Sequence, residues 1–365
     1  MKLRSRAPVR IDFAGGWSDV ALFCEQTPGC VVNAAISLYS YVSVNFLPKD
    51  TVEMSEYGYR TRYDIDNNGV KIYSADFDIY HEATDIKDLE YNGSIDLIKA
   101  VVKQLGVKGI EIVTRCDAPA GSGLGSSASM GVALCGAILQ ANRLDSDNQD
   151  QAIFPIEYAM MSCRIEQEEL GILGGSQDQL ASAYGGINLM EFNVENPDSF
   201  GGEKIHVSSV PMEKDVLYEL QKSLVLCYTG KSRLSGDIHR HVMQAYMSGN
   251  KQTKHAITEL TVIAQTLSRV LYLRQLEEFG PLLHENWRKQ KELHPSVSTP
   301  EMDAIYDLAM RNGATGGKAC GAGGGGCMVF YCPDAEHLVR KKLIETGVQI
   351  LDFHFDFDGL QTWMV

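Results

Sequence analysis

The sequence lacks the cysteine patterns of zinc sites and of disulfide frameworks. Nine cysteines are spread over 365 residues, and no two of them form a CxxC pair. Most lie in apolar runs such as VALCGAIL and LVLCYTG, which is typical of reduced thiols packed as small hydrophobic residues. We therefore expect no structural zinc, no disulfides and a reducing compartment such as the cytoplasm.

Signals for export and for membrane insertion are also missing. No apolar run reaches the length that crossing a bilayer requires. The N-terminal stretch MKLRSRAPVRIDFAGG has basic residues but no continuous apolar segment of a signal peptide. These absences predict a soluble, intracellular protein that has no membrane as a partner.

Positive charge is scarce relative to negative charge. The chain has 33 Lys and Arg against 47 Asp and Glu, and a formal net charge of −14. Such a chain repels phosphate backbones, so nucleic acid is not expected as a partner. A nucleotide bound in a local pocket is not excluded, because the field of a site can differ from that of the whole molecule.

The pattern of hydrophobic residues predicts an α+β protein of two domains. Clusters of strands alternate with clusters of helices, which argues against a doubly wound sheet. We place the boundary near residue 186, so that the domains are 1–186 and 187–365. Expected strands include 3–13, with an edge or bend at Pro8, 31–47, 109–116 and 223–228, and DNNG at 66–69 indicates a hairpin. Expected helices are 94–105, 126–142, 154–169, 176–184, three between 234 and 293, 300–311 and 334–345.

A glycine-rich turn that leads directly into an apolar helix is the strongest chemical signal. In PAGSGLGSSA, at residues 119–128, glycines stand on alternate positions and let the backbone approach a ligand closely. The following helix directs its free N–H groups toward the turn, so the segment predicts an anion cradle. An ordinary helix cap is the alternative. A GxxxxGK[ST] loop is excluded at Gly230-Lys231-Ser232, because Val225 replaces the first glycine.

Three segments resemble the superfamily of galactokinase, homoserine kinase, mevalonate kinase and phosphomevalonate kinase, the GHMP kinases. Residues 119–128 match the family signature at every fixed position. Arg6–Asp19 resembles the N-terminal substrate motif, and Lys318–Cys327 resembles the C-terminal glycine motif. The resemblance implies a ribosomal S5 domain 2-like N-terminal domain that binds ATP and a ferredoxin-like C-terminal domain that closes over the substrate.

The resemblance also implies how ATP and Mg²⁺ are held. The residues expected around the ATP phosphates are Pro119, Gly121, Ser122, Gly123, Leu124, Gly125, Ser126, Ser127 and Ala128. Ser127 is expected to bind Mg²⁺ together with Glu166, which lies twelve residues before Asp178. Hydroxyl and carboxylate oxygens suit this hard cation. Glu168 and Glu169 compete for the role, although a run of acids on a helix is usually a solvated face.

Asp178 and Arg10 are the expected catalytic residues. In the family pattern, Asp178 orients and deprotonates the attacking hydroxyl, while Arg10 keeps it ionised and helps neutralise the transferring group. Alternatively, Asp178 is an ordinary acid in the first turn of a helix and Arg10 an outward strand residue.

Substrate contacts are expected from both ends of the chain. They are Gly16, Trp17, Ser18 and Asp19 in GGWSD, and Gly323 and Gly324 in the glycine run 321–326. Trp17 either stacks on a sugar or fills the core. His239 and His241 form an HxH pair, which is typical of a polar helix surface rather than of a metal site.

Within the superfamily, the chain is similar to sugar 1-kinases of the heptose and fucose type. This implies phosphorylation of the anomeric hydroxyl of D-glycero-D-manno-heptose 7-phosphate to the 1,7-bisphosphate. A second cationic site is then needed, and Lys231 with Arg233 is the candidate. An L-fucose or other free-sugar kinase, a catalytically silent regulator and a decarboxylase of the isoprenoid branch are the alternatives. The sequence also leaves a homodimer open.

Overall fold

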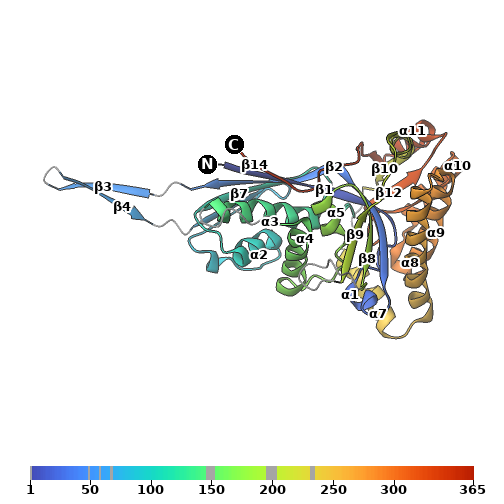
Figure 1. Ribbon diagram of the computed structural model, residues 1–365, viewed down its shortest axis with the longest axis horizontal. Helices are drawn as coiled ribbons and strands as arrows, with labels where there is room; N and C mark the ends of the chain where they lie inside the picture. The colour runs from blue at the N-terminus through green and yellow to red at the C-terminus, as the bar shows by residue number, and fades with distance from the viewer. Residues whose placement is uncertain are drawn as a thin grey trace.

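The computed structural model describes residues 2–47, 50–56, 59–65, 69–144, 153–194, 204–230 and 235–365. Within them, the chain forms a large sheet of eight strands, a smaller sheet of four strands and a separate two-stranded hairpin. Figure 1 shows helices packed below the large sheet and a second group of helices beside the smaller sheet. This mixture agrees with the α+β class that the sequence predicts.

The first strand, β1 (Lys2–Ala14), places charged side chains on the face opposite to its apolar residues. Val9, Ile11 and Phe13 are fully buried in a hydrophobic core. Side chains alternate along a strand, so Arg10 and Asp12 point the other way. The pairing register with β2 shifts after Pro8, and β14 pairs only with residues 3–6. The expected edge or bend at Pro8 is therefore confirmed.

The second strand, β2 (Gly29–Phe46), connects the parts of the large sheet. It pairs with β1 along most of its length, with β7 near one end and with β8 near the other. The other strands of this sheet are β5 (Val70–Ser74), β6 (Ile79–Ala83), β7 (Ile110–Cys116), β8 (Ile187–Phe192), β9 (Ile205–Ser209) and β14 (Gln361–Met364). The separate hairpin is β3 (Asp50–Glu56) with β4 (Tyr59–Ile65).

Helices of the first half pack on one side of the large sheet (Figure 1). They are α2 (Asp96–Leu105), α3 (Ser126–Leu144), α4 (Pro155–Arg164) and α5 (Gln177–Tyr184). A π-helix, Ile165–Glu169, follows α4 directly. The sequence predicts one regular helix over 154–169, and the π-helix changes which side chains of its last turn face inward.

The second half adds the smaller sheet and a layer of helices. Its strands are β10 (Leu224–Tyr228), β11 (Gly316–Ala319), β12 (Cys327–Tyr331) and β13 (Gln349–Ile350). Its α-helices are α6 (Lys214–Lys222), α7 (Ser235–Met247), α8 (Lys251–Tyr272), α9 (Phe279–Glu292), α10 (Pro300–Arg311) and α11 (Glu336–Glu345). The short helices are α1 (Ala21–Cys24) and the 3₁₀ turns Ile86–Asp88, Leu276–Glu278 and Pro295–Val297.

Strands from beyond residue 186 enter the large sheet as well as the smaller one. β8 pairs with β2, β9 pairs with β8, and β14 pairs with β1. A division into 1–186 and 187–365 stays a prediction. Helix α6 was not expected from the sequence, and the turn at 66–69 lies largely outside the described residues.

The cysteines agree with the expectation from sequence. All nine are free thiols, and seven of them are buried. Burial raises the pKa of Cys135 and of Cys320 to about 12, so these thiols stay protonated and act as packing residues. Across the described ranges, no helix combines the length and apolarity needed to cross a bilayer.

Helix α9 lies unusually close to strand β11 because glycines face each other there. A Cβ on Gly316 would lie 1.8 Å from the carbonyl oxygen of Gly280, and a Cβ on Gly280 would lie 2.0 Å from Oγ1 of Thr315. Real Cβ atoms do not approach a backbone oxygen so closely, so position 316 needs glycine, and a Cβ on Gly280 would displace Thr315. This contact fixes the strand that leads into the glycine run 321–326.

We predict that Gly316→Ala destabilises the protein by at least about 2 kcal/mol, because the new methyl group displaces α9. Thermal unfolding should show a lower Tm. Gly236→Ala is the control, because a Cβ at Gly236 meets nothing within 4 Å and alanine favours a helix. Equal Tm values for Gly316→Ala and the parent protein would contradict the close contact.

Candidate active site

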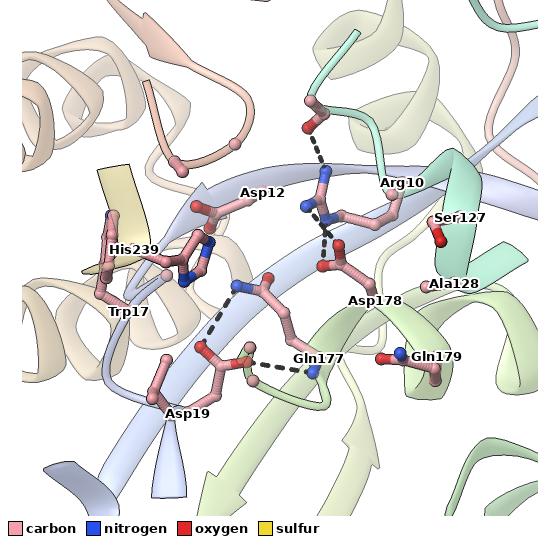
Figure 2. Close-up of a pocket in the computed structure, with 18 of the residues that line it drawn as sticks. Arg10, Asp12, Trp17, Asp19, Ser127, Ala128, Gln177, Asp178, Gln179 and His239 are labelled. Carbon is pink, nitrogen blue, oxygen red and sulfur yellow. Dashed lines mark hydrogen bonds and ion pairs between the residues drawn. The ribbon is translucent and has the colours of Figure 1, made fainter. Parts of the chain in front are cut away.

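A cavity of about 390 Å³ lies between the two halves of the chain. Figure 2 shows Trp17, His239 and Asp19 toward one end, Ser127 and Ala128 toward the other, and Arg10 with Asp178 between them. The chain segments that line it are 10–20, 121–128, 166–179 and 321–325, with His239 from α7. The three segments that carry the family resemblance thus contribute to one cavity.

The glycine-rich turn has the backbone of an anion cradle. Gly121, Gly123 and Gly125 have φ angles of 66°, 73° and 75°. The N–H groups of Ser122 and Leu124 donate within the turn, to the carbonyl of Pro119 at 3.0 Å and to Oγ of Ser122 at 3.4 Å, so the N–H groups of the glycines are the candidates for an anion. Helix α3 begins directly afterwards at Ser126. Leu124 and Ser122 are fully buried and anchor the turn. Pro119, Ser122 and Leu124 thus support the cradle without lining the cavity.

The two glycine segments of the chain touch each other through their backbones. The N–H of Cys327 donates to the carbonyl of Ser122 at 2.7 Å. A Cβ on Gly326 would lie 2.6 Å from the same carbonyl, and a Cβ on Gly321 would lie 2.8 Å from that of Gly123. Side chains here would separate the halves, so the glycines close the site from both sides.

Arg10 and Asp178 form a two-pronged ion pair in the middle of the cavity. Nε and Nη2 of Arg10 donate to the two carboxylate oxygens of Asp178, each at 2.8 Å, and Nη1 donates to the carbonyl of Gly123 at 2.7 Å. Burial alone lowers the pKa of Arg10, but the charges of Asp178 and Asp12 outweigh it and raise that pKa. The guanidinium is therefore charged, and it joins β1, α5 and the glycine-rich turn.

Glu166 lies beside Ser127 at the other end of the cavity. Oγ of Ser127 donates to one carboxylate oxygen of Glu166 at 2.8 Å, and Nε2 of Gln179 donates to the other at 2.6 Å. Burial raises the pKa of Glu166 to about 7, against the lowering effect of these hydrogen bonds. Adjacent hydroxyl and carboxylate oxygens suit Mg²⁺, and a bound cation would favour the ionised form of Glu166.

The competing acids have other surroundings. Glu169 accepts hydrogen bonds from Tyr91 at 2.6 Å and from Gln104 at 2.7 Å, and Glu168 is exposed. Glu166 is thus the member of the acidic run that reaches Ser127.

Asp19 is a buried carboxylate at the Trp17 end. It accepts from the backbone N–H of Gln177 at 3.1 Å and from its side-chain amide at 3.4 Å. Burial raises the pKa of Asp19 to about 7, against the lowering effect of the backbone hydrogen bond. A Cβ on Gly175 would lie 1.7 Å from an oxygen of Asp19, so the glycine at this position, two residues before α5, makes room for the carboxylate.

A second buried ion pair crosses between the halves. Nζ of Lys318, on β11, donates to the carbonyl and to Oδ2 of Asp12, both at 2.6 Å. Lys318 is fully buried, and Oδ1 of Asp12 has no hydrogen-bond partner in the described part of the chain. Asp12 was not among the residues expected from the sequence, although it stands two residues after Arg10 and so on the same face of β1.

The predicted substrate residues divide into two groups. Gly16, Trp17, Asp19 and Gly323 line the cavity. Ser18 does not, because its hydroxyl bonds to the carbonyls of Gly15 and Cys30 and secures the turn to β2. Gly324 does not either, because it packs against Ile238 of α7. Lys231 and Arg233 lie outside the described residues.

The prediction that the HxH pair lies on a polar helix surface is wrong for His239. The His239 ring lines the cavity and lies 4.6 Å from the Trp17 ring, whereas His241 is exposed and stacks on His294. Gln177 and Gln179 are further lining residues that sequence reasoning missed. The sequence places them on either side of Asp178, and this position could have indicated that they lie near the site.

Comparison with known proteins agrees with this geometry. The model of the GHMP kinase N-terminal domain matches residues 94–186, and that of the GHMP kinase C-terminal domain matches residues 267–349. These ranges contain the glycine-rich turn, Glu166, Asp178 and the glycine run 321–326.

Similar proteins cover the whole chain. D-glycero-α-D-manno-heptose 7-phosphate kinase of Campylobacter jejuni is 29% identical over 100% of this chain and 99% of its own. The bifunctional fucokinase/GDP-fucose pyrophosphorylase of Arabidopsis thaliana is 27% identical over 96% of this chain, which spans 31% of that protein. The crystal structure of a D-glycero-D-manno-heptose 1-phosphate kinase from Bacteroides thetaiotaomicron is 26% identical, with a TM-score of 0.74, over 100% of this chain and 99% of its own. Residues 94–186 and 267–349 thus carry the N- and C-terminal domains of the GHMP kinases, and the similar proteins extend this likeness over the whole chain.

Proposed function

We propose that this protein transfers the γ-phosphoryl group of ATP to the anomeric hydroxyl of D-glycero-D-manno-heptose 7-phosphate and so forms the 1,7-bisphosphate. The observation that carries the proposal is the position of Asp178. Arg10 holds its carboxylate between the glycine-rich turn and the end of the cavity where Asp19 and His239 offer hydrogen-bonding groups. The full-length similarity to the heptose 7-phosphate kinase of Campylobacter jejuni supports this choice of sugar.

The N–H groups of Gly121, Gly123 and Gly125 and the N-terminus of α3 bind the phosphate oxygens of ATP in this proposal. Gly123 has a further task, because its carbonyl accepts from Arg10 at 2.7 Å. The turn that holds the phosphates is therefore tied directly to the side chain next to the base.

Four carboxylates line the cavity, namely those of Asp12, Asp19, Glu166 and Asp178. Triphosphate in such a site needs a compensating cation. Ser127 and Glu166 would hold Mg²⁺, which neutralises charge on the phosphate oxygens.

Asp178 accepts the proton of the anomeric hydroxyl as the new P–O bond forms and the bond between the β–γ bridging oxygen and the γ-phosphorus breaks. Arg10 keeps Asp178 in one orientation and offers positive charge to the transferring group. Because both carboxylate oxygens of Asp178 accept hydrogen bonds from Arg10, Asp178 positions the hydroxyl as well as accepting its proton.

A sugar that already carries phosphate needs positive charge at its far end. Among the lining residues that the structure describes, Arg10 is the basic side chain, and it is already paired with Asp178. Lys231 and Arg233 are therefore the proposed partners of the 7-phosphate. A free-sugar kinase, as in the fucokinase part of the Arabidopsis thaliana relative, would not need them.

A silent regulator and an isoprenoid decarboxylase are less well supported. A regulator without turnover has no need of a carboxylate held by two hydrogen bonds from Arg10. The described lining residues include no unpaired Lys or Arg that would bind the carboxylate of an isoprenoid acid phosphate. The nine free thiols support a reducing compartment, and we propose the cytoplasm.

The proposal is tested by incubating the protein with Mg·ATP and a panel of sugars, with ADP release and product mass as readouts. We expect ADP with heptose 7-phosphate and a product one phosphate heavier. The variant Lys231→Gln/Arg233→Gln should raise KM for heptose 7-phosphate about tenfold or more and leave KM for any unphosphorylated sugar unchanged. Turnover of L-fucose but not of heptose 7-phosphate would contradict the proposed substrate.

We predict that Asp178→Asn lowers kcat by at least ~10²-fold and leaves the affinity for ATP nearly unchanged, because the amide cannot accept the proton. Single-turnover kinetics and ATP titration measure the two effects, and thermal unfolding checks that the variant is folded. A kcat equal to that of the parent protein would remove Asp178 from the mechanism.

We predict that Glu166→Gln raises the Mg²⁺ concentration needed for half-maximal rate by about tenfold or more, because the neutral amide is a weaker ligand. Glu168→Gln is the matched control, since Glu168 is an exposed neighbour on the same turn. Titration of the rate with Mg²⁺ at saturating sugar gives the comparison. The same Mg²⁺ dependence in both variants would rule out Glu166 as a ligand.

A further inference from the structure

His239 reaches the cavity from the second half of the chain. It lies in the second turn of α7, next to Ile238, which is buried and packs against Gly324. The N–H of Gly324 donates to the carbonyl of Val297 at 2.8 Å. The glycine segment is therefore fixed to both neighbours, and His239 has a defined place over the cavity.

The ring of His239 lies against Trp17. The two ring centroids are 4.6 Å apart and the ring planes are inclined by 32°. Figure 2 shows the imidazole between the indole and the side chains of Asp12 and Gln177. Trp17 belongs to the first half of the chain and His239 to the second, so the two rings together form one wall of the cavity.

Polar atoms without partners gather at this wall. In the described ranges, the buried atoms that lack a hydrogen bond include Oδ1 of Asp12, Nε1 of Trp17, Oε1 of Gln177 and Nδ1 of His239. Native proteins leave few buried polar groups unpaired. Acceptors and donors occur together here, which suits a ligand that both donates and accepts, as a polyhydroxyl compound does.

The chemistry of His239 is that of a neutral donor. Burial lowers its pKa, although the charge of Asp178 raises it in part. Nδ1 is enclosed without a partner in the described chain, and a proton placed there would be a buried, unsatisfied donor. The favoured tautomer therefore carries its proton on Nε2, the ring nitrogen that His239 can present to the cavity.

The backbone at Trp17 is unusual for such a large residue. Its φ is 84°, in a region that bulky side chains rarely adopt because it is strained. The strained turn keeps the indole against His239 and at the cavity, with 5% of its surface exposed.

We propose that His239 selects the sugar by donating a hydrogen bond through Nε2 to one substrate oxygen, while the indole of Trp17, packed in the hydrophobic core with Val20 and Phe23, holds the imidazole in place. The inference rests on the proposed sugar kinase function and adds a specificity residue from α7. An epimer with no oxygen in that direction leaves His239 unpaired in the closed site and binds more weakly.

The test compares His239→Phe with the parent protein. Phenylalanine keeps the ring contact with Trp17 and removes the donor. KM for the sugar should rise about tenfold or more, KM for ATP should change less than twofold, and discrimination between sugar epimers should fall. His239→Gln restores a donor and should recover part of the loss. His241→Phe is the matched control on the same helix, because His241 is exposed and stacks on His294.

An unchanged sugar KM and unchanged epimer discrimination in His239→Phe would overturn the proposal. A rise in both KM values would also overturn it, because that pattern indicates a structural role. The comparison uses whichever sugar the parent protein phosphorylates. Failure of heptose 7-phosphate as a substrate is thereby seen in the parent protein and is separate from failure of the His239 assignment.

Discussion

The arrangement of the active site depends on one side chain, the guanidinium of Arg10. It donates to both oxygens of Asp178 and to the carbonyl of Gly123, and its backbone N–H donates to the carbonyl of Leu124. One residue of β1 thus sets the distance between the glycine-rich turn and Asp178, the proposed base. Because the guanidinium is planar and buried, these bonds fix direction as well as distance. Lysine at this position could not reproduce the geometry.

Close contacts between glycines surround this ion pair. The two halves meet where Gly123 faces Gly321 and Ser122 faces Gly326, so backbone approaches backbone with no side chain between. Lys318, reaching Asp12 from β11, secures the same junction with a buried charge pair. Removing one partner of such a pair leaves an uncompensated charge, which costs more than the pair itself contributes. The junction therefore favours one relative position of the glycine-rich turn and the end of the cavity that contains Trp17.

Much of this could be predicted from the sequence, because the local signals are strong. The apolar residues of 3–13 predicted the strand that carries Arg10, and the glycine spacing at 119–128 predicted an anion cradle before α3. Other features needed the tertiary structure. Helical periodicity could not separate Glu166 from Glu168, since the π-helix at 165–169 changes the angular spacing of its residues. Ser18 was predicted to contact the substrate, but its hydroxyl bonds to the carbonyl of Cys30. That bond depends on how the turn packs on β2, which the sequence does not reveal. The orientation of His239 depends on how α7 packs against a glycine run more than eighty residues later in the chain.

The most direct test of the account is a crystal structure of the protein with Mg²⁺, a non-hydrolysable ATP analogue and the sugar that it phosphorylates. We predict the γ-phosphate against residues 121–127 and the attacking hydroxyl within about 2.6–3.2 Å of a carboxylate oxygen of Asp178. The bonds from Arg10 to Asp178 and to Gly123 should remain. A sugar whose reactive hydroxyl contacts Asp12 or Asp19, with Asp178 out of reach of it, would contradict the central claim.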